Sequence, residues 1–258
     1  MTAATRDSAR PRNRAALSRS PIILVVYQVR FDPQPLEPAS VLHFQELVGK
    51  REYPQIMQAP SPQLSLRIGE QAVAPAPTAG AWQIAAETGA WTISLGPDSA
   101  ALQTANGFTT WEESFQPRLA AFLAALEECM SPSITQRCGL RYVNQLSGLH
   151  IDSMPPDLGR YLSHVVIPAL DRSVGDVIGS QQQLLLRLAD ETMCGLRVAF
   201  GPEGRPHEYG CVIDIDVYSD VAQEFSAGSL SEAANRLNDN AHDVFEATLD
   251  PTYLDSLR

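Results

Sequence analysis

The chain repeats one order of predicted secondary-structure elements, and this repeat constrains its fold more than any other feature. In each half, β-branched and alternating apolar runs predict strands, and apolar residues at helical spacing predict helices. We predict an α+β fold of two tandem β-α-β-β-β-α halves, an internal duplication that gives mainly antiparallel sheet covered by helices. The alternative is that two generic α+β segments look alike by chance.

The predicted elements follow each other in the same sequence in both halves. The first half is expected to hold strands at residues 22–31, 64–68, 81–84, 91–95 and near 101–102, and helices at 40–50 and 109–130. The second half is expected to hold strands at 134–146, 182–188, 193–200 and 209–218, and helices at 156–170 and 229–249. The closing helices begin alike, since Thr110 with Glu113 and Ser229 with Glu232 have capping-box spacing.

These elements define three parts of the chain. Residues 1–20 form an Arg-rich tail without an apolar period, which we expect to be disordered. Residues 21–131 form the first α+β half, and residues 132–258 form the second. We expect the halves to pack as one globular unit.

Charge is distributed unevenly along the chain. The formal net charge is −11, but residues 1–20 hold five arginines and one aspartate, a charge of +4, which leaves −15 for the remainder. An acidic body repels phosphate backbones, so we expect no nucleic-acid surface on it. The basic tail alone remains able to contact anions.

Motifs for cofactors, metals and nucleophiles are absent from the sequence. The four cysteines form no C-x-x-C pair, the five histidines form no H-E-x-x-H motif, and there is no Walker A loop, G-x-G-x-x-G run or G-x-S-x-G elbow. We expect no cofactor, no metal and no catalytic residue.

The cysteines are typical of small buried hydrophobes in a reducing compartment, and no run approaches the roughly 20 apolar residues of a membrane span. We therefore expect a cytoplasmic protein without membrane contact.

Asp214 and Asp216 alternate along a predicted strand, so both carboxylates point to one face, roughly 6–7 Å apart by strand rise. This arrangement could hold Mg²⁺ through carboxylate oxygens. The apolar residues between and around them favour the other interpretation, an amphipathic strand with a solvated polar face.

Charged and polar residues on the predicted strands form one candidate network. Arg137 and Arg141 share a strand face, and Arg30 occupies the corresponding place in the first half. Pairing of Arg141 with Asp214 or Asp216 would be structural, whereas an unpaired arginine cluster in a cavity would indicate a phosphorylated ligand; we favour the pairing. The candidate polar network or anion-binding site comprises Arg30, Arg137, Arg141, Tyr142, Asn144, Asp214 and Asp216. Within it, Tyr142 and Asn144 are expected to belong to a hydrogen-bonded core network.

Several separated motifs resemble one known family. They are Val29-Arg30-Phe31-Asp32-Pro33, Tyr53-Pro54, Trp111-Glu112 with Phe115, Gly139-Leu140-Arg141-Tyr142-Val143-Asn144, Asp214-Ile215-Asp216-Val217-Tyr218, Leu237-Asn238, Val244-Phe245-Glu246 and the stretch after Thr248. In order and spacing they are similar to a family of sporadically distributed bacterial proteins of about this length, over nearly all of residues 22–258. The resemblance implies no assigned activity, cofactor or catalytic residue. Scattered occurrence suggests a bacterial defence or mobile-element context.

Three functional hypotheses follow from the sequence. The favoured one is a non-enzymatic binding or partner protein that binds another protein or a second copy of itself. The second is a metal-assisted phosphate- or nucleotide-handling enzyme that uses Asp214 and Asp216. The third is an antitoxin-like protein whose acidic surface neutralises a basic toxin.

Overall fold

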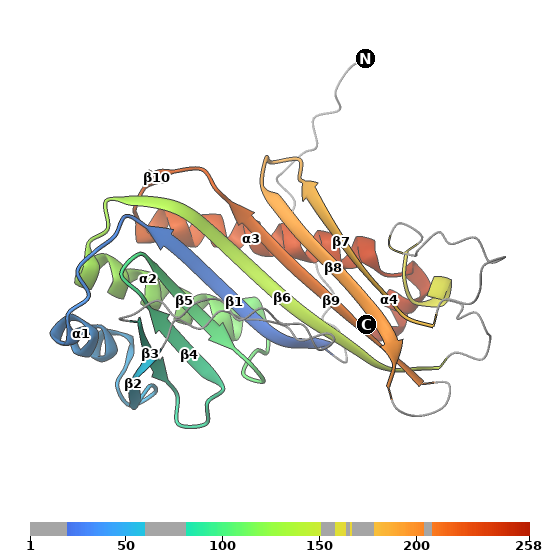
Figure 1. Ribbon diagram of the computed structural model, residues 1–258, viewed down its shortest axis with the longest axis horizontal. Helices are drawn as coiled ribbons and strands as arrows, with labels where there is room; N and C mark the ends of the chain where they lie inside the picture. Colours follow the sequence, from blue (N-terminus) through green and yellow to red (C-terminus); the bar gives the residue numbers. More distant parts are fainter. Residues whose placement is uncertain (1–19, 60–80, 151–157, 164–165, 167–177, 204–207) are drawn as a thin grey trace, which may run out of the picture.

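A 10-stranded antiparallel sheet forms the centre of the computed structural model, which describes residues 20–59, 81–150, 158–163, 166, 178–203 and 208–258. The order across the sheet is β2-β3-β4-β5-β1-β6-β9-β8-β7, and β10 pairs with the start of β6 (Figure 1). The strands are β1 (Ile22–Phe31), β2 (Gln55–Ala59), β3 (Ala81–Ala85), β4 (Trp91–Leu95), β5 (Ser99–Thr104), β6 (Ile134–His150), β7 (Ser180–Arg187), β8 (Met193–Pro202), β9 (Glu208–Ser219) and β10 (Gln223–Glu224).

The strands before residue 131 occupy one side of this sheet, and those after it occupy the other. β1 and β6 lie next to each other at the join. On its other side, β1 pairs with β5, and β6 pairs with β9. The first strand of each half therefore lies beside the last long strand of the same half.

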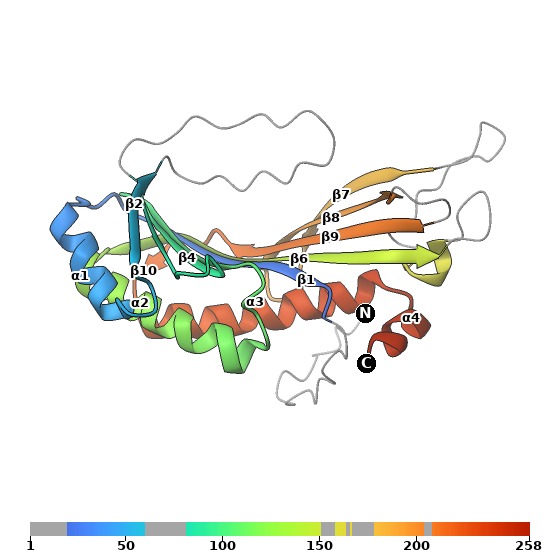
Figure 2. The same ribbon diagram turned by 90° about the horizontal axis from the view of Figure 1, so that it is seen from below.

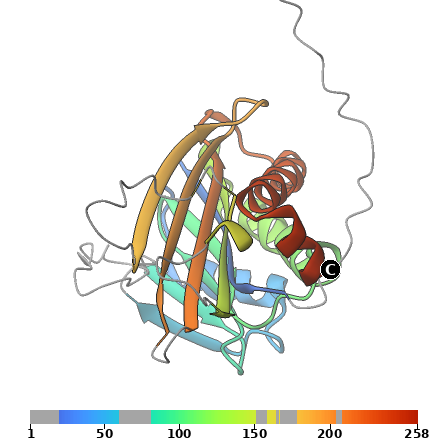
Figure 3. The same cartoon turned by 90° about the vertical axis from the view of Figure 1, so that its right-hand side faces the viewer.

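Helices cover one face of the sheet (Figure 2). They are α1 (Pro38–Val48), the π-helix η1 (Trp111–Phe115), α2 (Gln116–Met130), α3 (Ala227–Thr248) and α4 (Pro251–Leu257), with a 3-10 turn η2 (Leu158–Arg160). α1 packs on α2, α2 packs on α3, and α3 packs on β6 and β9. Figure 3 shows α3 and α4 on this same side of the sheet. The opposite face, which no described helix covers, is called the open face below.

The core lies between the sheet and the helices. Alternate residues of β1 (Val25, Tyr27, Val29 and Phe31) are fully buried against the helical layer, because successive strand side chains point to opposite faces. The residues between them, including Gln28 and Arg30, point to the open face. β9 repeats this alternation, with Ile213, Ile215 and Val217 in the core and Asp214 and Asp216 on the open face.

The structure confirms an α+β architecture with mainly antiparallel sheet and helices, and it corrects several predicted elements. β2 was not predicted, whereas the strand predicted at 64–68 lies outside the described residues. Of the helix predicted at 156–170, the described part forms η2, a bridge from Leu162 to Leu249 and a 3-10 residue at Val166, and no α-helix. Most of residues 1–20 also lie outside the described part of the chain.

The two closing helices begin differently from each other. Thr110 caps the first, accepting a hydrogen bond from the Glu113 N–H, and a π-turn follows in which the Gln116 N–H reaches the Trp111 carbonyl. Pro117 has no N–H to continue the α-helical pattern there, which explains the wider turn. The capping box predicted at Ser229 is wrong, because α3 begins earlier and Ser226, in extended backbone, accepts the Ser229 N–H.

Among the described helices, none combines the length and the apolar composition needed to cross a bilayer.

Candidate functional site

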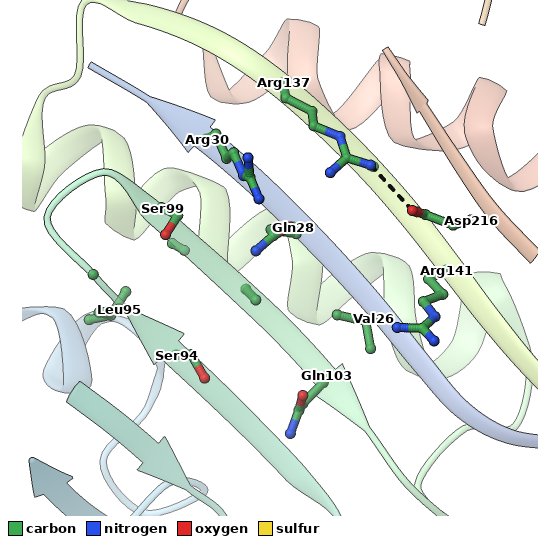
Figure 4. A pocket seen from close by; sticks show the side chains of 14 residues that line it. Val26, Gln28, Arg30, Ser94, Leu95, Ser99, Gln103, Arg137, Arg141 and Asp216 are labelled. Atoms are coloured by element: carbon green, nitrogen blue, oxygen red, sulfur yellow. Dashed lines mark hydrogen bonds and ion pairs between the residues drawn. The ribbon is translucent and has the colours of Figure 1, made fainter. Parts of the chain in front are cut away.

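Two strands of the second half place arginines and aspartates together on the open face. In the β6–β9 register, Arg141 lies opposite Asp216, and Val143 lies opposite Asp214. Arg137, four residues before Arg141, points to the same face because strand side chains alternate. The side chains of Arg137, Arg141 and Asp216 project together from β6 and β9 (Figure 4).

Arg141 forms a two-point ion pair with Asp214. Its Nε lies 2.7 Å from Asp214 Oδ1, and its second guanidinium nitrogen lies 2.8 Å from Oδ2. The Arg141 and Asp214 side chains are only 18% and 6% exposed. Burial lowers the pKa of Arg141, but hydrogen bonds and charge attraction from Asp214, with Asp216 adding to them, outweigh burial and raise it. This pair is the structural pairing expected from the sequence.

Arg137 is held by three partners. One guanidinium nitrogen lies 3.2 Å from Asp216, its Nε lies 3.4 Å from Asp220, and the guanidinium carbon lies 4.1 Å from the centre of the Tyr218 ring. Gly139 lies directly opposite Tyr218, where an added Cβ would approach the Tyr218 Cβ to 3.1 Å, so glycine allows close packing at this point. Burial raises the pKa of Asp216 even though Arg137 and Arg141 attract its charge.

A pocket of about 310 Å³ opens beside these ion pairs on the open face (Figure 4). Strands of both halves form it, and its lining comprises Val26, Gln28, Arg30, Ser94, Leu95, Gly96, Ser99, Ala100, Ala101, Gln103, Arg137, Gly139, Arg141 and Asp216. Apart from its apolar floor, the lining consists of three arginines, two amides, two serine hydroxyls and one carboxylate.

Arg30 is the exposed arginine of this pocket. It lies directly opposite Arg137 on β6 and opposite Ser99 on β5. Within the described chain, no carboxylate pairs with Arg30, in contrast to Arg137 and Arg141. The pocket therefore combines paired and unpaired arginines.

Tyr142 and Asn144 lie on the other face of β6 and do not line the pocket. Tyr142 donates from its hydroxyl to Asn238 Oδ1 of α3 at 2.7 Å. Asn144, 3% exposed, donates from its amide nitrogen to the Ile213 carbonyl at 3.2 Å. The structure thus brings Arg30, Arg137, Arg141, Asp214 and Asp216 together and places Tyr142 and Asn144 in the hydrogen-bonded core.

The sequence pattern did not identify four polar residues that line the pocket, which are Gln28, Ser94, Ser99 and Gln103. Gln28 shares strand parity with Arg30, and this signal places it on the same face. The other three lie on β4 and β5, and only the strand order brings them beside β1.

The described residues contain no group of three or more histidine, cysteine, aspartate or glutamate side chains that could hold a metal ion. Both oxygens of Asp214 already accept hydrogen bonds from Arg141, and Asp216 accepts one from Arg137. The carboxylate pair is therefore engaged by guanidinium groups and does not form an open set of oxygen ligands.

Comparison of the chain with models of known protein families finds no match, and no curated protein matches it.

Proposed function

We propose that this protein is a non-enzymatic binding protein that holds a carboxylate or phosphate group in the pocket of the open face. The observation that carries the proposal is Arg30, an exposed arginine inside a pocket, opposite a second arginine and without a described carboxylate partner. A binding role without catalysis also agrees with the absence of nucleophile and cofactor motifs from the sequence.

Electrostatic repulsion between Arg30 and Arg137 supports an anionic ligand. Like charges directly opposite each other on neighbouring strands are destabilising. Asp216 and Asp220 compensate Arg137, but no described group compensates Arg30. An anion between the two strands would supply that charge, and the planar guanidinium group can bind two of its oxygens at once.

The remaining lining fits the same ligand. Gln28, Gln103, Ser94 and Ser99 provide amide and hydroxyl donors around Arg30. The volume of about 310 Å³ lies at the lower end of the range for small-molecule pockets, so it suits one acidic group or a small polyanion. A free metabolite and an acidic side chain of a partner protein would present the same chemistry.

The pocket also lies where the two halves meet, and we propose that these halves arose by duplication. The strand order supports this, since β1 pairs with β5 and β6 with β9 on either side of the join. Under this proposal, Arg141 and Asp214 hold the second half together, and Arg30 of the first half supplies the free cation.

The ion pairs do not favour the metal-assisted enzyme, because a magnesium ion would have to displace Arg141 from Asp214. No described feature favours the antitoxin-like role over a general binding role.

Thermal unfolding of the full chain with inorganic phosphate, pyrophosphate, citrate and a glutamate-rich peptide tests the proposal. A ligand that binds only the folded state raises the midpoint. We expect at least one of these anions to raise it, and we expect Arg30→Gln to remove the effect. Arg51→Gln is the control, because Arg51 is an exposed arginine outside the pocket.

Two results would contradict anion binding at this site. One is no shift with any of the four probes, and the other is an equal shift in the wild type and in Arg30→Gln. A shift that appears only with added Mg²⁺ and disappears in Asp214→Ala would instead support the metal-assisted alternative.

A further inference from the structure

The strand β7 forms one end of the sheet, and its outer side is unpaired among the described residues. The opposite end, β2, is a strand of 5 residues, whereas β7 has 8 residues in unbroken register with β8. Short edge strands and bulges limit unwanted strand addition. β7 has neither feature.

The hydrogen-bond pattern shows which residues of β7 present their backbone outward. At the β7–β8 turn, the Leu188 N–H donates to the Thr192 carbonyl at 2.8 Å, so the pair Leu188 and Thr192 is hydrogen-bonded. Along two antiparallel strands, hydrogen-bonded residue pairs alternate with non-hydrogen-bonded pairs, whose N–H and C=O groups point away from the partner strand. The N–H and C=O groups of Gln181, Gln183, Leu185 and Arg187 therefore point away from β8.

The side chains of β7 are also suited to pairing. Leu184 and Leu186 are half-buried on the helix side, and Leu185 is 67% exposed on the open face. β7 contains no lysine or proline, which are common at protected sheet edges. β7 contains no carboxylate, so no two carboxylates face each other when two copies pair along this strand.

We propose that β7 pairs antiparallel with β7 of a second copy, about a two-fold axis at Leu184. This register overlaps nearly the whole strand and pairs residues on matching faces. It places Gln183 opposite Leu185 and Gln181 opposite Arg187 of the second copy, so the outward backbone groups meet and no two arginines face each other. On the helix side, Leu184 of one copy meets Leu184 of the other at the axis, as in an isologous interface, and Leu186 lies opposite Gln182.

Light scattering coupled to size exclusion, over a dilution series of the full chain, tests this dimer. We expect twice the chain mass for the wild type and the single-chain mass for Gln183→Pro and for Leu185→Pro. Each proline removes one outward N–H and no β8 hydrogen bond, which an edge strand tolerates. Gln183→Thr keeps the N–H and should remain dimeric.

Circular dichroism and urea unfolding test whether each proline variant is folded. A folded monomer from either variant supports the proposal. A monomeric wild type, or a dimer that persists in every folded proline variant, would overturn it. A monomeric wild type that gains a strand from another protein also overturns it, because the second copy is the proposed occupant.

Cysteine cross-linking tests the register. Residues at the axis form a non-hydrogen-bonded pair with Cα atoms about 4.5 Å apart, which lies within the disulfide range. Leu184→Cys should therefore give a cross-linked dimer on mild oxidation. Leu185→Cys should not, because its counterpart lies diagonally at about 7–8 Å. Cross-linking of Leu185→Cys in preference to Leu184→Cys would overturn the proposed axis.

Discussion

Arg141 and Asp214 form their two-point ion pair diagonally across β6 and β9. The residue directly opposite Arg141 is Asp216, yet Asp216 pairs with Arg137. Asp214 and Asp216 are thereby each hydrogen-bonded to a different arginine of β6, and Arg197 of β8 lies 4.0 Å from Asp214 as well. Arg30, on the neighbouring strand β1, is the pocket arginine outside this arrangement.

Removal of Asp214 should destabilise the fold strongly. Asp214→Ala leaves Arg141, whose side chain is 18% exposed, without its main partner. Removing one partner of a buried ion pair lowers the free energy of unfolding by about 3 kcal/mol. Asp220→Ala is the control, because Asp220 is 63% exposed and a surface pair contributes about 0–1 kcal/mol. Urea unfolding measures both, and equal losses would contradict a structural role specific to the Arg141–Asp214 pair.

Residue alternation in the sequence was sufficient to predict which side chains share a face. It grouped Arg137 with Arg141 and Asp214 with Asp216, and the structure places all four on the open face. The pocket could not be predicted in full, because it depends on which strands are neighbours. Nothing in the sequence pairs β1 with both β5 and β6, and it is this pairing that places Arg30 between Ser99 and Arg137.

Helix boundaries and short strands were also beyond the sequence pattern. Ser226 and Ser229 are both plausible caps, and the choice depends on where the chain leaves β10 in extended backbone. β2 carries only a weak alternating signal in five residues, and it is defined by its pairing with β3. Tertiary contacts decide such elements more than local propensity does.

Reversal of the charge at Arg30 should stabilise the protein in the absence of ligand. A glutamate at this position would lie opposite Arg137 and replace a like-charge pair with an attractive one, a change of about 0.2–1 kcal/mol. Arg30→Gln, which only removes the repulsion, should lie between the wild type and Arg30→Glu. Chemical unfolding in low salt measures the series. A loss of stability in Arg30→Glu would show that the repulsion is absent or already compensated.

Asn235 should contribute to the attachment of α3 to the helix that begins at η1. Its Oδ1 accepts hydrogen bonds from Trp111 Nε1 at 2.8 Å and from the Gln116 amide at 3.1 Å. Asn235→Ala leaves the indole N–H of Trp111, a residue only 6% exposed, without this acceptor, and such a loss costs about 1–3 kcal/mol. Gln116→Ala removes one donor from the same acceptor and should cost less. The free energies of unfolding of the two variants test this order, and the reverse order would contradict it.

Asp216 should make the fold less stable as the pH rises through its titration. Burial raises the folded-state pKa of Asp216 above the value of 3.8 expected for an unfolded chain, despite the attraction of Arg137 and Arg141. Above pH 3.8 the folded protein therefore retains a proton that the unfolded chain has released, and stability falls until the folded pKa is passed. Asp216→Asn removes this titration.

The free energy of unfolding of the wild type, minus that of Asp216→Asn, should accordingly decrease as the pH rises from 3.8 and then become constant. Urea unfolding of both proteins across this pH range measures the difference, and taking the difference cancels the titration of other groups that the substitution leaves unchanged. A difference that instead increases with pH would mean that attraction by Arg137 outweighs burial. Asp216 would then be a net stabilising partner of the arginines above its pKa.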